Sequence, residues 1–293
     1  MAIVEASLVD AAFAKINLTL RVLGRRADGY HELESLVAFA DIGDMVRLQT
    51  GAPLALEIDG PYAADCGAPA DNLVLKAAAA LSAQVAGLKL GRFCLTKELP
   101  VAAGIGGGSA DAAAALRLLV HGNRQIFSTV DFADSRVQAA ALAVGADVPV
   151  CLASTTCIMR GMGERLSPVE MPRLHAVLVN PGVAVATRDV FAKFTGAPEN
   201  RQPVAPLGDV PRTPDALLAL LAQHDNDLTP AAIACAPVIG DVLAQLRAAP
   251  GSLLARMSGS GATCFALFPS AAQAAAAAQS MRKDWWATAV TLG

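Results

Sequence analysis

The sequence contains few of the features that mark a metal site, a nucleic-acid surface or a membrane anchor. Its six cysteines form no C-x-x-C pair, and His31 and Glu32 do not begin a zinc-protease helix because Ser35 replaces the second histidine. The formal net charge of −3 offers no general attraction to nucleic acid or to an anionic membrane. No stretch reaches the ~18 uninterrupted apolar residues of a membrane span, and acidic residues interrupt the first apolar run. We therefore expect a cytoplasmic protein with reduced cysteines that binds neither nucleic acid nor membrane.

Charged side chains are also scarce, at 17% of the sequence, whereas hydrophobic residues make up 54%. This balance is typical of a globular chain rather than a disordered one. The 293 residues are enough for two modest domains. We place the boundary near residue 160, so that residues 1–160 form an N-terminal domain and residues 161–293 a C-terminal one.

The stretch from Pro100 to Leu119 reads PVAAGIGGGSADAAAALRLL, with glycines at positions 104 and 106–108. Glycine lets the backbone adopt positive φ and approach a ligand closely. We expect the following helix to start at Ser109, because residues 110–120 are rich in alanine and leucine and contain no proline. The first N–H groups of that helix, and the positive end of its dipole, would then point into the loop. The pattern predicts a phosphate-binding site.

Three other interpretations of these glycines fit less well. A Walker loop needs lysine followed by Ser or Thr, whereas Gly108 is followed by Ser109 and Ala110. A dinucleotide fingerprint needs glycine at position 109, and Asp131, near the spacing of its acidic residue, is on no clear strand. A purely structural turn would carry a cost of roughly 0.5 to 1 kcal/mol for each glycine, which disfavours it for four glycines.

The loop resembles P-x-x-x-G-L-G-S-S-x-A, the second motif of the GHMP kinases, a superfamily that includes galactokinase, homoserine kinase, mevalonate kinase and phosphomevalonate kinase. Its triple glycine is similar to the version in the diphosphocytidyl-methylerythritol kinases. Further segments resemble that group in the same order and span nearly the whole chain: AKINL at 14–18, GRRADGYHEL at 24–33, GADVP at 145–149, NPGVAVATRDVF at 180–191 and SGSG at 258–261. The resemblance implies an α+β fold of two domains, with the active site in the cleft between them.

The activity that the resemblance implies is ATP-dependent phosphorylation, with magnesium, of the 2-hydroxyl of 4-diphosphocytidyl-2-C-methyl-D-erythritol. Asp147 would accept the hydroxyl proton, and Lys15 would keep that carboxylate ionised and steady the developing oxyanion. One alternative is another small-molecule GHMP kinase, of the homoserine or mevalonate type. A second is a nucleotide-binding regulator without catalysis. The DGYH segment argues against the first, and the presence of both Lys15 and Asp147 argues against the second.

The resemblance also assigns residues to the cytidine end of the substrate. Tyr30 would stack on the cytosine ring and His31 would form hydrogen bonds with it. Thr187 and Phe191 would close over the base. Asn17, on the same face of its strand as Lys15, would also bind substrate. On sequence grounds alone, a pair such as Tyr30 and His31 is more often surface structure than a ligand site, and Phe191 is an apolar position of a helix.

The ATP phosphates would bind the glycine loop. By resemblance, its binding residues are Pro100, Val101, Ala102, Ala103, Gly104, Ile105, Gly106, Gly107, Gly108, Ser109 and Ala110. Ala110 replaces the usual second serine, so Ser109 would be the remaining hydroxyl ligand to phosphate or magnesium. Asn72 and Lys97 lie near positions that contact nucleotide in the family. No residue is assigned to a dedicated metal site.

Local patterns give further expectations. The alternation in residues 14–22 predicts a strand whose outer face exposes Thr19 and Arg21 to solvent. Asp71 is expected to cap a helix that Gly87 ends. Asp147 is expected between a helix and a strand, where its side chain could instead cap a turn. Other strands are predicted at 33–39, 45–50, 54–58, 90–96 and 175–180, helices at 137–144, 187–191, 214–223 and 230–248, and an irregular connection at 121–136.

Overall fold

The computed structural model describes residues 7–27, 29–127, 132–196 and 205–293, so Asp28 and Asp131 lie outside the described residues. The chain forms two compact units, and each unit is built from three segments that are not contiguous in the sequence. The first unit contains the residues up to Ala14 together with Ile42–Val101 and Gly106–Ser154. The second contains Lys15–Asp41, Ala102–Ile105 and Thr155–Gly293. The last crossing between them, after Ser154, comes shortly before the boundary expected from the sequence, and the chain also crosses at earlier points.

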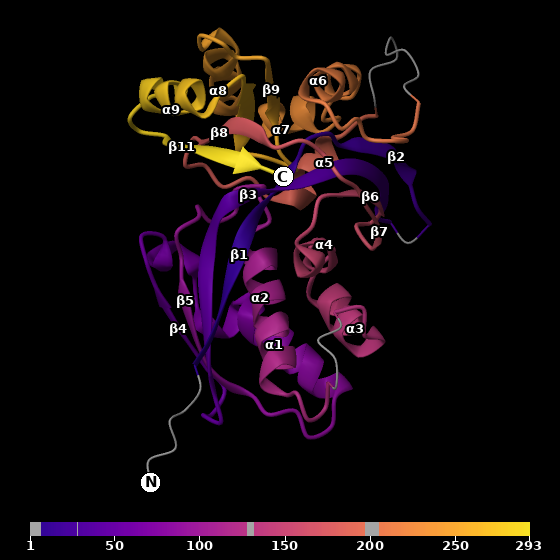
Figure 1. Cartoon of the computed structure of the whole chain (residues 1–293), viewed down its shortest axis with the longest axis vertical. Coiled ribbons are helices and arrows are strands. Elements are labelled where there is room, and N and C mark those ends of the chain that lie inside the picture. Colours follow the sequence, from indigo (N-terminus) through magenta and orange to yellow (C-terminus); the bar gives the residue numbers. More distant parts are fainter. Residues whose placement is uncertain (1–6, 28, 128–131, 197–204) are drawn as a thin grey trace. The chain divides into compact units, whose positions relative to one another are not determined.

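A small sheet forms one side of the first unit. Strand β4 (Ala55–Asp59) runs parallel to β5 (Gly91–Thr96), and β5 pairs antiparallel with the second half of β3 (His31–Thr50). Strand β1 (Ser7–Asn17) also pairs with β3. Helices α1 (Leu73–Gln84) and α2 (Gly107–Gly122) pack against each other beside this sheet (Figure 1). Helices α3 (Ser135–Val144) and α4 (Val148–Ala153) complete the unit.

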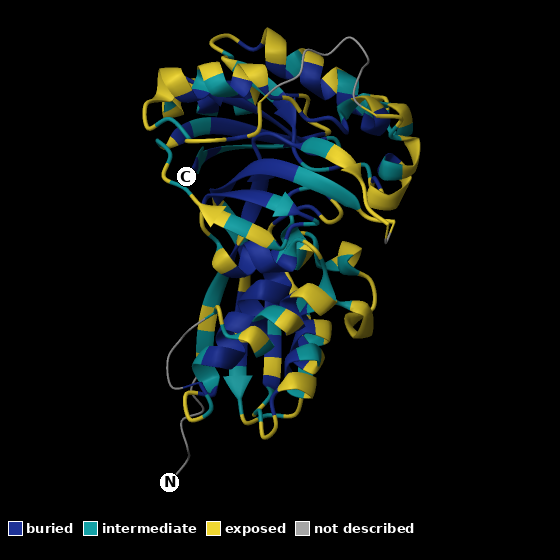
Figure 2. Cartoon of the chain, turned by 90° about the vertical axis from the view of Figure 1, so that its right-hand side faces the viewer, coloured by how far each residue is buried: buried dark blue, intermediate teal, exposed yellow. Residues whose placement is uncertain are grey.

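Helix α2 lies at the centre of the first unit. Every residue from Ala110 to Val120 is buried, and Figure 2 shows the helix in dark blue along most of its length. Such complete burial explains why alanine dominates the sequence here, because small side chains let neighbouring helices approach closely. The helix that follows the predicted phosphate loop is therefore anchored in the core of its unit.

The second unit contains a larger antiparallel sheet. Strand β8 (Leu174–Asn180) lies between β10 (Cys264–Phe268) and β11 (Trp286–Leu292), and β10 pairs with β9 (Leu254–Met257). Helices α8 (Val238–Ala248) and α9 (Ala271–Ser280) cover one face, with their exposed residues directed outward (Figure 2). The unit's remaining helices are α5 (Thr187–Lys193), α6 (Pro214–Gln223) and α7 (Thr229–Cys235).

The first half of β3 belongs to the second unit and extends its sheet. It pairs with β2 (Arg21–Arg25), with β6 (Cys157–Gly161) and, at Ala40, with β11. Strand β6 pairs in turn with β7 (Arg165–Pro168). β3 is thus one long strand where the sequence predicted two, since residues 40–44 continue it. Gly43 permits this continuation, because a Cβ atom there would lie 2.7 Å from the carbonyl carbon of Ala12 in β1.

The prediction of one strand over residues 14–22 with a solvated outer face is wrong in two respects. β1 ends at Asn17 and β2 begins at Arg21, so the alternating stretch is broken. Its supposed outer face is buried, because Thr19 has no exposed surface and its hydroxyl accepts a hydrogen bond of 2.9 Å from the backbone N–H of Leu36. The alternation of polar and apolar residues therefore indicated neither one continuous strand nor a solvated face at Thr19.

Helix ends account for several other differences. Asn72, not Asp71, caps α1, since its side chain accepts a hydrogen bond from the N–H of Val74. Asp71 instead ends a short 3-10 helix, η2 (Pro69–Asp71). The helix predicted over 230–248 is divided into α7 and α8 at Pro237, where a proline cannot continue a hydrogen-bonded helix. Part of the segment predicted to be irregular, 121–136, is helical at both ends.

Candidate active site

The exit of the glycine loop forms the start of α2, in the first unit. The helix begins at Gly107, two positions before the predicted start at Ser109, and Gly106 precedes it in the left-handed conformation, with φ of 68°. The N–H of Ala110 already donates to the carbonyl of Gly106 at 2.7 Å. The first N–H groups of a helix have no intrahelical partner. Gly107, Gly108 and Ser109 therefore supply three consecutive donors at the positive end of the helix dipole.

The middle of the loop, Ala102–Ile105, belongs to the second unit and packs against the SGSG segment. Gly104 has φ of 73°, and a Cβ atom on it would lie 2.8 Å from the carbonyl carbon of Gly261. The Ser258 hydroxyl donates to the Gly104 carbonyl at 3.1 Å. The N–H of Lys15 donates to the Ile105 carbonyl at 2.9 Å. Two glycine-containing segments and the end of β1 thus form one hydrogen-bonded structure.

Asn17 contributes an unusual buried acceptor to this structure. Its side chain is 1% exposed, and its amide nitrogen donates to the Ser35 hydroxyl at 2.7 Å. Its backbone N–H donates to the Ser258 hydroxyl. Its Oδ1, in contrast, is buried without a hydrogen-bond partner among the described residues. Because a buried polar atom without a partner costs about 1–3 kcal/mol, this oxygen is a candidate contact for a substrate hydroxyl.

The two predicted catalytic side chains lie in different units. Lys15, in the second unit, is 3% exposed. Burial raises the pKa of the nearby Cys157 thiol to about 11, and the charge of Lys15 acts in the opposite direction by lowering that pKa. Asp147, in the first unit, stands at the N-cap position of α4, yet its side chain makes no capping hydrogen bond. The strand predicted after Asp147 is wrong, since Pro149 lies in the first turn of a helix, where proline is well tolerated.

The predicted cytidine residues are partly brought together in the second unit. The rings of His31 and Phe191 are stacked, with centroids 4.6 Å apart and planes at 23°, while Tyr30 is 60% exposed. Burial, with a smaller contribution from the charge of Arg25, lowers the pKa of His31. A neutral imidazole can both donate and accept a hydrogen bond, which suits recognition of a base edge.

Thr187 is the first residue of α5, whose N-cap residue is Ala186. Its hydroxyl lies 2.9 Å from the hydroxyl of Ser260 in the SGSG segment. Ser260 lies in the predicted SGSG motif, whereas no predicted motif includes Asn226, whose amide donates to the carbonyls of Met257 and Gly259 at 2.8 Å. Both contacts are long-range, so no local pattern could have shown them.

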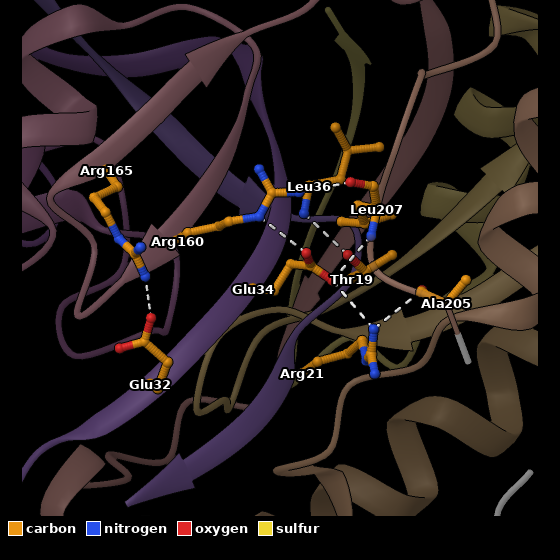
Figure 3. A network of polar contacts seen from close by, with 9 residues as sticks. All are labelled: Thr19, Arg21, Glu32, Glu34, Leu36, Arg160, Arg165, Ala205 and Leu207. Atoms are coloured by element: carbon orange, nitrogen blue, oxygen red, sulfur yellow. Dashed lines mark hydrogen bonds and ion pairs between the residues drawn. The ribbon is translucent and has the colours of Figure 1, made fainter. Parts of the chain in front are cut away.

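Strand β3, which carries His31, is held by a network around one buried carboxylate (Figure 3). Glu34 accepts hydrogen bonds from Arg21 at 3.2 Å and from Arg160 at 3.0 Å, its cross-strand partners in β2 and β6. It also accepts from the N–H of Leu207 at 3.0 Å. Next to His31 on the same strand, Glu32 forms an ion pair with Arg165 of β7. The network fixes the register of the three strands.

Comparison with known proteins gives the class of this fold. The GHMP kinases N terminal domain matches residues 72–155, and the GHMP kinases C terminal domain matches residues 212–286. A crystal structure of homoserine kinase from Cytophaga hutchinsonii aligns with a TM-score of 0.65 at 20% identity, covering 100% of this chain and 96% of that one. The fold is that of a GHMP kinase, as the sequence predicted.

More similar relatives identify the family within that class. The 4-diphosphocytidyl-2-C-methyl-D-erythritol kinase of Rhodopseudomonas palustris strain BisB18 is 55% identical, over 98% of this chain and 95% of its own length. That of Nitrobacter hamburgensis is 53% identical, over 98% and 96%. A crystal structure of 4-(cytidine 5'-diphospho)-2C-methyl-D-erythritol kinase is 34% identical, with a TM-score of 0.75 and coverage of 98% and 99%. The chain therefore belongs to the 4-diphosphocytidyl-2-C-methyl-D-erythritol kinase family of the GHMP kinases.

Two further observations bear on ligands and membranes. Among the residues that the structure describes, no group of three or more His, Cys, Asp or Glu side chains is placed to hold a metal ion. Within the same part of the chain, no helix has the length and apolar character needed to cross a bilayer. The six cysteines, all of which lie in the described ranges, form no disulfide.

Proposed function

We propose that this protein transfers the γ-phosphoryl group of ATP to the 2-hydroxyl of 4-diphosphocytidyl-2-C-methyl-D-erythritol, a step toward isoprenoid precursors. The observation that carries the proposal is the start of α2, where left-handed Gly106 leads into three backbone donors next to the Ser109 hydroxyl. The relatives of the chain, 55% and 53% identical, are named for this substrate. A cytoplasmic location is consistent with six cysteines that form no disulfide.

The chemistry follows from the roles proposed for a few residues. The N–H groups of Gly107, Gly108 and Ser109 hold the phosphates, and their fixed dipoles stabilise the charge that develops there. Asp147 accepts the proton of the attacking hydroxyl. Lys15 supplies positive charge that stabilises the developing oxyanion. The unpartnered Oδ1 of Asn17 accepts a hydrogen bond from the substrate.

The start of α2 fits a magnesium ion that binds together with ATP. The ion prefers six oxygen ligands and commonly takes most of them from phosphates and water, with one or two from the protein. The Ser109 hydroxyl, in the first turn of α2, is the protein oxygen that we assign to it. When bound, magnesium neutralises charge between the phosphates.

A substrate comparison tests the proposed function directly. Purified protein with ATP and magnesium should release ADP when the diphosphocytidyl substrate is added, and not above background with homoserine or mevalonate. Faster ADP release with either of those alcohols would favour another GHMP activity. Binding of ATP with no turnover of any of the three would instead favour a nucleotide-binding regulator.

Replacement of His31 by Ala should raise the KM for the cytidine substrate about tenfold or more, because a lost buried hydrogen bond typically costs ~1–3 kcal/mol. The KM for ATP should stay nearly unchanged. Replacement of Phe194, which meets the His31 ring edge-on at 6.3 Å, by Leu provides a control for loss of aromatic packing alone. Equal weakening toward both substrates in the His31 variant would refute the assignment to cytosine.

Ser109→Ala should strongly reduce turnover, whereas Ala110→Ser should change it little. Ser109 is partly exposed in the first turn of α2, but Ala110 is buried and its N–H is already bonded to Gly106. Measurement of kcat as a function of magnesium concentration would compare the two variants. A markedly altered magnesium dependence in Ala110→Ser would show that position 110 reaches the metal and that Ser109 does not act alone.

A further inference from the structure

A buried charge cluster lies behind the start of α2 and has no part in the mechanism described so far. It consists of Lys97, Asp44 and Asp111, each at most 3% exposed. The Lys97 ammonium pairs with Asp44 and, at 2.8 Å, with Asp111. Asp44 lies on β3, Lys97 directly after β5, and Asp111 on α2, so the cluster joins three elements of the first unit.

The cluster is attached to both ends of the glycine loop. At the entrance, the second oxygen of Asp44 accepts hydrogen bonds from the N–H groups of Glu98 at 2.7 Å and Leu99 at 2.8 Å, directly before Pro100. At the exit, a Cβ atom on Gly107 would lie 3.2 Å from Lys97 Nζ and 3.9 Å from Asp44 Oδ2. The cluster therefore occupies the space that a side chain at Gly107, the first of the three phosphate donors, would need.

Stability alone does not account for this arrangement. Buried ion pairs are often no better for stability than apolar residues of similar volume. Here two carboxylates share one ammonium, and Asp111 Oδ1 is buried without a hydrogen-bond partner among the described residues. Burial, together with the charge of Asp44, raises the pKa of Asp111 to about 7, although Lys97 acts in the opposite direction. The cluster can thus hold a proton near neutral pH and avoid an uncompensated negative charge behind the phosphates.

We propose that Asp44 and Asp111, linked by Lys97, are positioning residues for phosphoryl transfer. By holding the entrance and the exit of the loop to one buried ammonium, they fix the N–H groups of Gly107, Gly108 and Ser109 in the geometry that binds the phosphates of ATP. The inference rests on the proposed function, since it deepens the role of the same loop. It assigns to these side chains no contact with the substrate.

Helix α2 itself provides a matched control. Arg117, further along the helix, is also buried, pairs with Asp10 at 2.6 Å and donates to the carbonyl of Cys151 at 2.8 Å. Its contacts lie away from the loop. Arg117→Met should therefore lower the melting temperature without changing the KM for ATP, whereas Asp111→Ala should raise that KM about tenfold or more, the effect of a lost hydrogen bond to a charged group. The KM for the cytidine substrate should change less than about twofold.

Asp111→Asn gives a second, gentler variant in case Asp111→Ala does not fold. Its amide oxygen can still accept from Lys97, so it should restore most of the ATP affinity that Asp111→Ala loses. Asp44→Asn should not, because both Asp44 oxygens act as acceptors. Calorimetric titration with ATP, at a temperature where all variants are folded, measures binding even if no phosphoryl transfer occurs. It therefore separates failure of this inference from failure of the proposed function.

The outcomes are distinct. Weakened ATP binding in Asp111→Ala and Asp44→Asn, with recovery in Asp111→Asn and none of this in Arg117→Met, supports the positioning role. If Asp111→Ala and Arg117→Met lose melting temperature alike while ATP affinity stays unchanged in both, the cluster is structural and the inference is wrong.

Discussion

Asp147→Asn should lower kcat on the order of 10² to 10⁴-fold, with the affinity for both substrates largely retained. Asparagine keeps the size and the hydrogen-bonding capacity of the side chain but removes its basicity. The hydroxyl proton then has no acceptor as the phosphoryl group arrives, although in a loose transition state that proton leaves late. Steady-state kinetics together with ATP titration would separate the loss of turnover from any loss of binding.

Lys15→Ala tests the second residue proposed to act in the same catalytic step. It should also slow turnover, because the proposed charge stabilisation of the developing oxyanion is lost. If the two residues act as one unit, the double variant should be little worse than the poorer single one. Near-normal kcat in Asp147→Asn, with a lower melting temperature, would show that Asp147 is structural despite the lack of a capping hydrogen bond.

Gly104→Ala should reduce turnover on the order of 10²-fold, as expected when reacting groups are displaced by about 1 Å. Two penalties act at this position. The φ of 73° is strained for alanine by about 1–2 kcal/mol, and the new Cβ would lie 2.8 Å from the Gly261 carbonyl carbon. Since the second contact is with backbone, the loop or the SGSG segment must move.

Gly87→Ala is a control that carries only the first penalty, so comparison with Gly104→Ala isolates the second. Gly87 has nearly the same φ, 76°, but nothing lies within 4 Å of a Cβ atom there. It should show only the backbone strain, whereas Gly104→Ala should cost a further 1–3 kcal/mol, roughly, in the free energy of unfolding, as overpacking does. Equal melting temperatures and equal turnover in the two variants would mean that the close approach of Gly104 and Gly261 is unimportant.

Elements with a local signal were predictable from the sequence. Helix α6 has its predicted bounds, Pro214–Gln223, because proline suits the first turn and the apolar positions repeat at helical spacing. The glycine loop lies between a strand and a helix as expected. The exact start of α2 did not follow, since Gly106 ends the loop by its left-handed backbone, and no capping side chain marks that position.

Features that depend on distant parts of the chain were not predictable. Asp44 is 53 positions from Lys97, and Asp111 is 14 positions from it, so their cluster leaves no spacing pattern in the sequence. Thr19 looks like a solvent-facing strand residue, yet it is buried by contact with Leu36. Fold and family were accessible through motifs, whereas the groups that support the motifs required the three-dimensional structure.

The position of the new phosphate in the product tests the central claim most directly. Purified protein, ATP, magnesium and the diphosphocytidyl substrate would be incubated, and the product examined by phosphorus–proton correlation in NMR. The account predicts one new phosphate ester on the 2-hydroxyl of the methylerythritol moiety and one ADP for each product molecule. An ester on another hydroxyl, or ADP release without an organic phosphate product, would contradict it.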